Sequence, residues 1–259
     1  MVDDGKATPG LPETTRSGLG TMVFTLTGNL YLLLGTIVMS TLAILVSWVP
    51  PRGDLVFGVA RLWSRGLLFA SGARLEVSGR EGLADGGGYV FMSNHQSMYD
   101  IPALLASLPV QTRFLAKRSL FKIPLFGWAI ALGGFISVDR SDRSRARESF
   151  AAAVEQLKRG TSTLIFPEGT RSLDGRLSDF ERGGFLLALK SGLDIVPVGI
   201  HGSLNVRRRG NLIVRPGRIG VCYGRPIAVG SYGIRGREEL EGVVRGHLTE
   251  LMDLAVRES

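Results

Sequence analysis

The chain has 259 residues, of which 44% are hydrophobic, and this is enough for one sizeable hydrophobic core. Its only cysteine is Cys222, so an intramolecular disulfide is excluded. The net charge of +8 favours an anionic partner, namely nucleic acid, acidic lipid head groups or a phosphorylated substrate. Composition does not distinguish among these partners.

The amino-terminal part of the chain differs from the rest. Residues 1–16 are polar, which predicts a disordered leader, and residues 17–51 contain no charged side chain, whereas about 20 residues suffice to cross a bilayer. A secretory signal peptide is an alternative, but this stretch exceeds the usual ~7–15 apolar residues and lacks a good cleavage site. We therefore predict a membrane anchor over residues 17–51. It is either one long helix or, if Gly28 and Gly35 break it, a hairpin of two short helices.

Strands and helices alternate through residues 52–259, the predicted folded domain. Helical periodicity predicts helices over 55–70, 101–108, 141–159, 183–191 and 238–256, and an apolar helix that ends at Gly134. Short apolar or alternating runs predict strands over 74–78, 89–92, 112–116, 135–138, 161–166, 194–200, 212–214 and 218–223. We therefore expect an α/β fold with a mixed, largely parallel central sheet flanked by helices, preceded by the membrane-embedded helical segment.

One polar stretch, Asn94-His95-Gln96-Ser97-Met98-Tyr99-Asp100, follows the predicted strand at 89–92. His95 falls at the carboxyl end of that strand and Asp100 at the start of a helix, where open α/β sheets place ligand sites. If the chain folds back, Asp100 holds one imidazole nitrogen while the other faces a substrate, which makes His95 a general base. The alternative is that Asp100 only caps the helix, with Ser97, and that His95 is a polar loop residue.

Three further stretches accompany it, and the order of all four carries a family resemblance. They are KRSLFKIPLFGW at 117–128 with GGFISVDR at 133–140, FPEGTRS at 166–172, and IVPVGI at 195–200. Together with residues 94–100 they resemble the four sequence blocks of the glycerolipid acyltransferases, most closely the lysophosphatidate acyltransferases. The resemblance covers roughly residues 75–225. It favours the catalytic interpretation of His95 and Asp100 over the capping one.

The resemblance implies a reaction. The chain would transfer a fatty acyl group from acyl-CoA or acyl carrier protein to the sn-2 hydroxyl of 1-acyl-sn-glycerol-3-phosphate, giving phosphatidate. His95 would take the proton of the acceptor hydroxyl as it attacks the thioester, and Asp100 would fix the imidazole tautomer. No acyl-enzyme, cofactor or metal is implied.

The resemblance also implies how the substrates bind. In the family the block at 166–172 binds the acceptor phosphate, to which Arg171 brings a forked cation and Gly169 close backbone N–H groups. Glu168 would orient Arg171 or a lysine. The substrate-binding candidates are Lys117, Arg118, Arg140, Glu168, Gly169, Thr170 and Arg171. For each of the cations the alternative is a solvated surface charge.

Apolar residues near 125–128 suggest where an acyl chain would lie. Leu125, Phe126 and Trp128 are candidates for the wall of an acyl pocket, although a buried helix is the alternative for this stretch. A basic cluster at 207–218 is suited to the phosphates of CoA, an acyl carrier protein or anionic membrane lipid, or it is simply solvated.

One position departs from the family pattern. Family members often carry Phe-Lys-x-Gly after the FPEGTRS block, whereas this chain has Phe180-Glu181-Arg182-Gly183. Either the charge has moved to Arg182 or the acceptor is another lysolipid, such as lyso-ornithine lipid. A non-enzymatic membrane lipid-binding protein is a third hypothesis. Nucleic-acid binding lacks a recognised module.

The expected partners are therefore membrane lipids, lysophosphatidate and an acyl donor, and not nucleic acid. Arg52, Arg61 and Arg65 closely follow the predicted anchor. By the positive-inside rule this places the catalytic domain on the cytoplasmic side of the inner (cytoplasmic) membrane.

Overall fold

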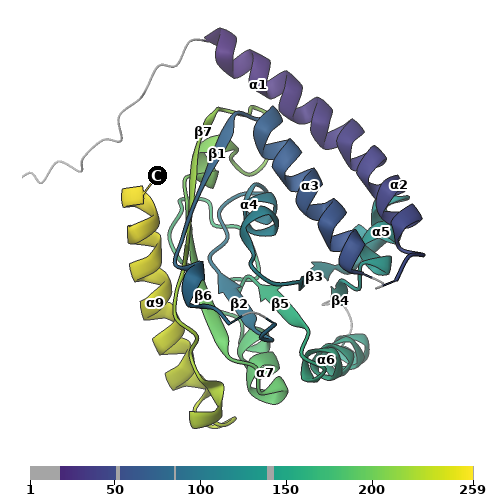
Figure 1. Cartoon of the computed structure of the whole chain (residues 1–259). Coiled ribbons are helices and arrows are strands. Elements are labelled where there is room, and N and C mark those ends of the chain that lie inside the picture. Colours follow the sequence, from purple (N-terminus) through teal and green to yellow (C-terminus); the bar gives the residue numbers. More distant parts are fainter. Residues whose placement is uncertain (1–17, 51–52, 85, 139–142, 259) are drawn as a thin grey trace, which may run out of the picture.

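The computed structural model describes residues 18–50, 53–84, 86–138 and 143–258, with the side chains of 143–146 and 258 excepted. The predicted leader, residues 1–16, lies outside the described residues. The helices are α1 (Gly18–Leu30), α2 (Thr36–Val46), α3 (Asp54–Ala70), α4 (Asp100–Ser107), α5 (Phe126–Leu132), α6 (Arg143–Lys158), α7 (Arg182–Ser191), α8 (Ser203–Val206) and α9 (Arg237–Glu258) (Figure 1). The strands are β1 (Ala73–Ser78), β2 (Val90–Ser93), β3 (Thr112–Lys117), β4 (Ile136–Val138), β5 (Ser162–Ile165), β6 (Ile195–His201) and β7 (Gly217–Tyr223).

The strands form one sheet in the order β1-β7-β6-β2-β5-β3-β4. Every neighbouring pair is parallel except β6 and β7, which are antiparallel. The predicted mixed, largely parallel sheet is therefore confirmed. Because β2, β3, β5 and β6 run in one direction, the segments that follow them all emerge at the same edge of the sheet.

Helices cover both faces of this sheet. Figure 1 shows α9 on one face and α3 and α4 on the other, with α1 and α2 outside α3. The side chains of β2 alternate between the two cores: Phe91 packs in the cluster with α3 and α4, whereas Val90 and Met92 pack in the cluster with α6, α7 and α9. All three are fully buried, which explains why this central strand is an unbroken apolar run.

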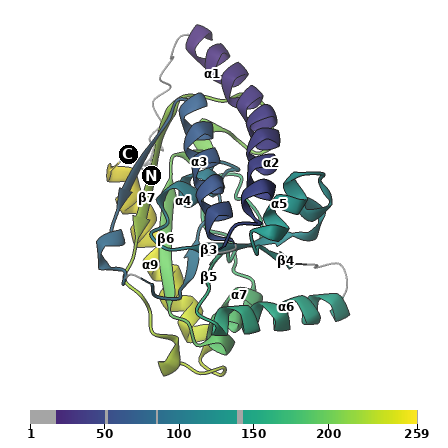
Figure 2. The ribbon, with the colours of Figure 1, turned by 45° about the vertical axis from the view of Figure 1, so that its right-hand side comes forward.

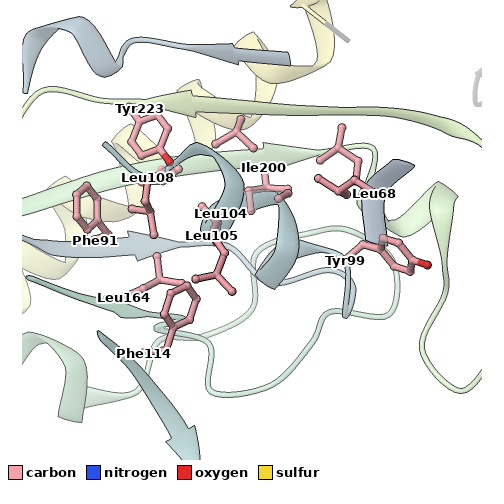
Figure 3. Packing of buried hydrophobic residues seen from close by; sticks show 14 of the residues in the cluster. Leu68, Phe91, Tyr99, Leu104, Leu105, Leu108, Phe114, Leu164, Ile200 and Tyr223 are labelled. Atoms are coloured by element: carbon pink, nitrogen blue, oxygen red, sulfur yellow. The ribbon is translucent and has the colours of Figure 1, made fainter. Parts of the chain in front are cut away.

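Helix α4 is the element that carries Asp100 into the core. Its Leu104 and Leu105 are buried in the same cluster as Phe91 and Leu164 of the sheet (Figure 3). Each apolar side chain of this size contributes roughly 1.5–3 kcal/mol when it is fully buried. Packing of the leucines therefore fixes the position of Asp100, the first residue of α4.

The amino-terminal segment is one continuous helix. A π-helical turn at Tyr31–Gly35 joins α1 to α2, so the chain does not fold into two short helices. The combined helix Gly18–Val46 has 29 residues and is long and apolar enough to cross a membrane. Only 11% of its most apolar stretch is buried in the protein, so it is not a core helix.

Polar side chains on the inner side of α1 attach it to the domain. The Thr25 hydroxyl donates to the Val214 carbonyl (3.1 Å) and accepts from the Val214 N–H (3.0 Å). The Asn29 amide donates to the Leu212 carbonyl at 2.8 Å. The predicted strand at 212–214 is therefore wrong: these residues lie outside the sheet, since side chains of α1 bond their backbone in place of a neighbouring strand.

Candidate active site

His95 and Asp100 form the centre of the candidate site. The His95 Nδ1 lies 2.7 Å from Asp100 Oδ2, and the imidazole is 13% exposed whereas the carboxylate is fully buried. The same Oδ2 accepts the backbone N–H groups of Gln96 (2.6 Å) and Ser97 (2.8 Å). The carboxylate thus turns back onto the residues that precede α4. Its bond from the Ser97 N–H is the contact expected of a capping box, so Asp100 caps the start of the helix and holds the imidazole with the same oxygen.

This contact fixes the tautomer of the histidine. A carboxylate oxygen that receives three donors accepts the Nδ1 proton, which leaves a lone pair on Nε2. No described residue forms a hydrogen bond with Nε2. The imidazole is therefore arranged as a general base that can receive a proton from outside the protein.

Phe166 fixes the plane of the ring. The His95 and Phe166 ring centroids are 3.8 Å apart and the planes differ by 13°, so the two rings are stacked. Phe166 directly follows β5, the neighbour of β2, and both rings therefore leave the same edge of the sheet. Sequence reasoning did not assign this role, although Phe166 opens the FPEGTRS block.

The block at 166–172 also holds the backbone of His95. The buried Glu168 accepts the His95 N–H at 2.7 Å through Oε1, and the Ser172 N–H donates to the His95 carbonyl at 2.8 Å. The other oxygen of Glu168 accepts the Ser178 N–H (3.0 Å) and hydroxyl (2.8 Å). Glu168 thus fastens the loop to the backbone of His95. The expectation that it orients Arg171 or a lysine is wrong for the described cations, since none of them contacts it.

The tip of this block faces outward. Gly169 has φ +69°, a conformation that favours glycine, and its N–H donates to the Phe166 carbonyl at 3.0 Å, so that group closes the turn. Thr170 is exposed and accepts from Arg209 Nη1 at 3.4 Å. The Arg171 guanidinium, half-exposed, has no hydrogen-bond or ion-pair partner within the described residues. It is thus available to an anionic ligand.

The remaining predicted cations are less closely placed. Lys117 and Arg118 are exposed at the carboxyl end of β3, which is separated from β2 by β5. They share the edge of the sheet with His95, but no described contact joins them to it. Arg140 lies outside the described residues.

Helix α5 carries the predicted acyl-pocket residues and packs beside α2 (Figure 2). Leu125 and Phe126 are half-buried and Trp128 is 58% exposed, so this stretch is not a fully buried helix. Leu125 has φ +61° and ψ −60°, and the Phe126 N–H donates to the Pro124 carbonyl at 2.7 Å, which makes a strained γ-turn. The predicted residues therefore begin a helix that lies against the amino-terminal helix.

The described residues contain no cluster of three His, Cys, Asp or Glu side chains that could hold a metal ion. The fold and the site together define a class, an α/β protein with a histidine held by a carboxylate at the carboxyl edge of its sheet. Residues 74–201 match the family model described as Acyltransferase. A 1-acyl-sn-glycerol-3-phosphate acyltransferase of Pseudomonas aeruginosa is 32% identical over 229 residues, which cover 86% of this chain and 88% of that protein. The chain belongs to the acyltransferase family.

Other matches agree with this assignment. A chloroplastic 1-acyl-sn-glycerol-3-phosphate acyltransferase of Arabidopsis thaliana is 33% identical over 79% of this chain and 56% of its own length. A chloroplastic one of Brassica napus is 34% identical over 65% of this chain and 49% of its own length. The chain thus spans about half the length of these plant relatives. The crystal structure of a 1-acyl-sn-glycerophosphate (LPA) acyltransferase, PlsC, from Thermotoga maritima superposes with a TM-score of 0.77 at 24% identity, covering 90% of this chain and 96% of that one. It has the same fold.

Proposed function

We propose that the chain transfers an acyl group from a thioester, acyl-CoA or acyl carrier protein, to the sn-2 hydroxyl of 1-acyl-sn-glycerol-3-phosphate, giving phosphatidate. The observation that carries the proposal is the 2.7 Å contact between His95 Nδ1 and Asp100 Oδ2, which leaves Nε2 as a base. The names of the family relatives support this acceptor.

The chemistry follows from that base. The Nε2 of His95 takes the proton of the acceptor hydroxyl while its oxygen attacks the thioester carbonyl carbon, and Asp100 stabilises the imidazolium that forms. The tetrahedral intermediate then collapses, the carbon–sulfur bond breaks, and the imidazolium returns the proton to the departing thiolate. A new ester and a free thiol are the products, and no acyl-enzyme forms.

The acceptor phosphate needs cations at the mouth of the site. Arg171 is the first candidate, because its forked donors suit a phosphate and no described residue occupies them. Arg182 is the second candidate, because it stands next to the position where this chain departs from the family pattern, and it is the exposed first residue of α7. The position before it, where family members often carry lysine, is the exposed Glu181, which keeps another lysolipid acceptor in consideration.

We also propose that residues 17–51 anchor the chain in the inner (cytoplasmic) membrane, with residues 52–259 facing the cytoplasm. The length and composition of Gly18–Val46 support the anchor, and Arg61 and Arg65 on the neighbouring α3 support the orientation. Extraction of membranes with alkaline carbonate tests the anchor, and release of the protein into the supernatant would argue against it. Protease access from each side of sealed vesicles tests the orientation.

An acceptor and donor panel tests the reaction. Purified full-length protein in lipid is supplied with labelled acyl-CoA or acyl carrier protein and with lysophosphatidate, lyso-ornithine lipid or neutral lysolipids. We expect lysophosphatidate to be acylated most efficiently, with phosphatidate as the labelled product. A clear preference for lyso-ornithine lipid would show that the acceptor is a different lysolipid. If no lysolipid were acylated, the proposed function would be contradicted.

A further inference from the structure

Residues 206–215 form a closed loop between α8 and β7, here called the arginine loop. The Arg215 N–H donates to the Val206 carbonyl at 2.9 Å, which joins the two ends. The tip is a β-turn in which the Asn211 N–H donates to the Arg208 carbonyl at 3.2 Å, and Gly210 supplies the positive φ of +77°. Arg209 therefore stands at the outer corner of a defined turn.

A buried arginine supports this turn from below. Arg207 is only 8% exposed, and its Nε donates to the Asn211 carbonyl at 2.8 Å. Its own carbonyl accepts the Ser97 hydroxyl at 2.6 Å in a buried contact. Because Ser97 also donates its N–H to Asp100, the arginine loop is connected to the turn that holds the catalytic base.

The far side of the arginine loop is fixed to the amino-terminal helix. Asn29 bonds the carbonyl of Leu212 and Thr25 bonds both backbone groups of Val214. The loop is thus held between the catalytic turn and α1. The residues on both sides of its tip are therefore bonded to the rest of the protein.

Arg209 reaches the outward-facing tip of the block at 166–172. Its Nη1 lies 3.4 Å from the Thr170 hydroxyl, and the next residue in that segment is Arg171. Within the described residues neither arginine has a carboxylate partner. Arg209 thus contacts the residue next to Arg171, and no described acid lies between the two arginines. Such a pair of guanidinium groups is suited to an anion that carries more than one negative charge.

We propose that Arg209 is a second phosphate-binding residue, so that the phosphate monoester of the acceptor is held between Arg171 and a cation from the arginine loop. The inference rests on the proposed function, whose acceptor carries that phosphate. It assigns one part of the basic cluster at 207–218 to the acceptor and not to the acyl donor.

Steady-state kinetics with a matched pair of variants test the proposal. Arg209→Ala should raise the KM for lysophosphatidate about tenfold, with kcat within a factor of about two, since a hydrogen bond to a charged group is lost and the base is untouched. Arg208→Ala, which removes the exposed neighbouring charge, should change KM less than about twofold. Arg209→Lys should raise KM by an amount between those of the two alanine variants, because lysine keeps the positive charge but lacks the forked donors of the guanidinium. Equal effects of Arg208→Ala and Arg209→Ala would overturn the assignment.

A binding measurement separates this inference from the reaction itself. In a His95→Ala background, which removes the base, we would measure the binding of fluorescent lysophosphatidate and of a fluorescent neutral monoacylglycerol. Adding Arg209→Ala should weaken the binding of lysophosphatidate about tenfold and leave that of the neutral lipid unchanged. Unchanged or equally weakened binding of both lipids would contradict the role of Arg209, even if acyl transfer is found. Arg209-dependent binding without turnover in wild type would contradict only the proposed reaction.

Discussion

A single oxygen of Asp100 accepts hydrogen bonds from the imidazole Nδ1 and from two backbone N–H groups. This residue therefore both shapes the turn and sets the tautomer of His95. An asparagine side chain of nearly the same shape lacks the charge that stabilises the imidazolium. We expect Asp100→Asn to lower kcat by roughly 10³-fold or more, by analogy with the same change in hydrolase triads. Measuring kcat beside the thermal unfolding curve separates lost chemistry from lost structure. A folded variant with kcat within tenfold of wild type would contradict the assigned role.

Part of the site could be predicted because it is local. His95 and Asp100 are five residues apart across a strand-to-helix turn, and the prediction that the carboxylate holds one imidazole nitrogen is confirmed at 2.7 Å. The role of Glu168 could not be predicted in this way. Its partner, the His95 N–H, is 73 positions away, and only the pairing of β2 with β5 brings the two together.

At the scale of elements, α9 lies unusually close to the sheet because two glycines face it. A Cβ at Gly199 of β6 would stand 2.4 Å from the backbone carbonyl carbon of Leu251, and one at Gly220 of β7 2.5 Å from the carbonyl oxygen of Ala255. We expect Gly199→Ala to lower the free energy of unfolding by about 1–3 kcal/mol, since helix backbone must move away. Thermal unfolding in detergent measures the change.

Gly246 in α9 provides a control of opposite sign. Nothing lies within 4 Å of a Cβ built there, and the position is inside the helix. Gly246→Ala should therefore stabilise the protein by up to about 1 kcal/mol through helix propensity. If both alanines had the same effect on stability, the close approach of α9 would not be the cause.

Periodicity predicted the other strands and the helices α3, α4, α6, α7 and α9 because their apolar faces pack in the two main cores. It failed at residues 212–214, where the apolar run Leu212-Ile213-Val214 has the composition of a short strand. The competing interaction comes from Thr25 and Asn29, nearly two hundred positions earlier in the chain. A window of a few residues contains no signal for such a contact, and the apolar composition alone predicts a strand there.

At the scale of the whole molecule, one half-buried histidine links stability to pH. Burial lowers the pKa of His201, at the carboxyl end of β6, below its ordinary value of 6.5. Below that pH the unfolded chain takes up a proton that the folded protein binds less readily, so stability is lost as the pH falls. We expect His201→Gln to reduce the loss of stability between neutral pH and about pH 5. If the free energy of unfolding fell equally with pH in wild type and variant over this range, His201 would not be the cause.

The whole molecule also places three parts in a fixed relation: an apolar helix, a basic loop and the histidine proposed as the base. The arginine loop contacts α1 through Asn29 and the catalytic turn through Ser97. A lipid acceptor whose phosphate binds at Arg171 and Arg209 would therefore meet His95 at a set distance from the amino-terminal helix. This arrangement suits a substrate that is itself part of a membrane.

The most direct measurement is acyl transfer from labelled acyl-CoA to lysophosphatidate by purified wild-type and His95→Ala protein in lipid vesicles. We predict labelled phosphatidate from wild type and a loss of about 10²–10⁴-fold or more in the variant, because the general base is missing. Phosphatidate formed at comparable rates by both proteins would contradict the central claim that His95 is the base.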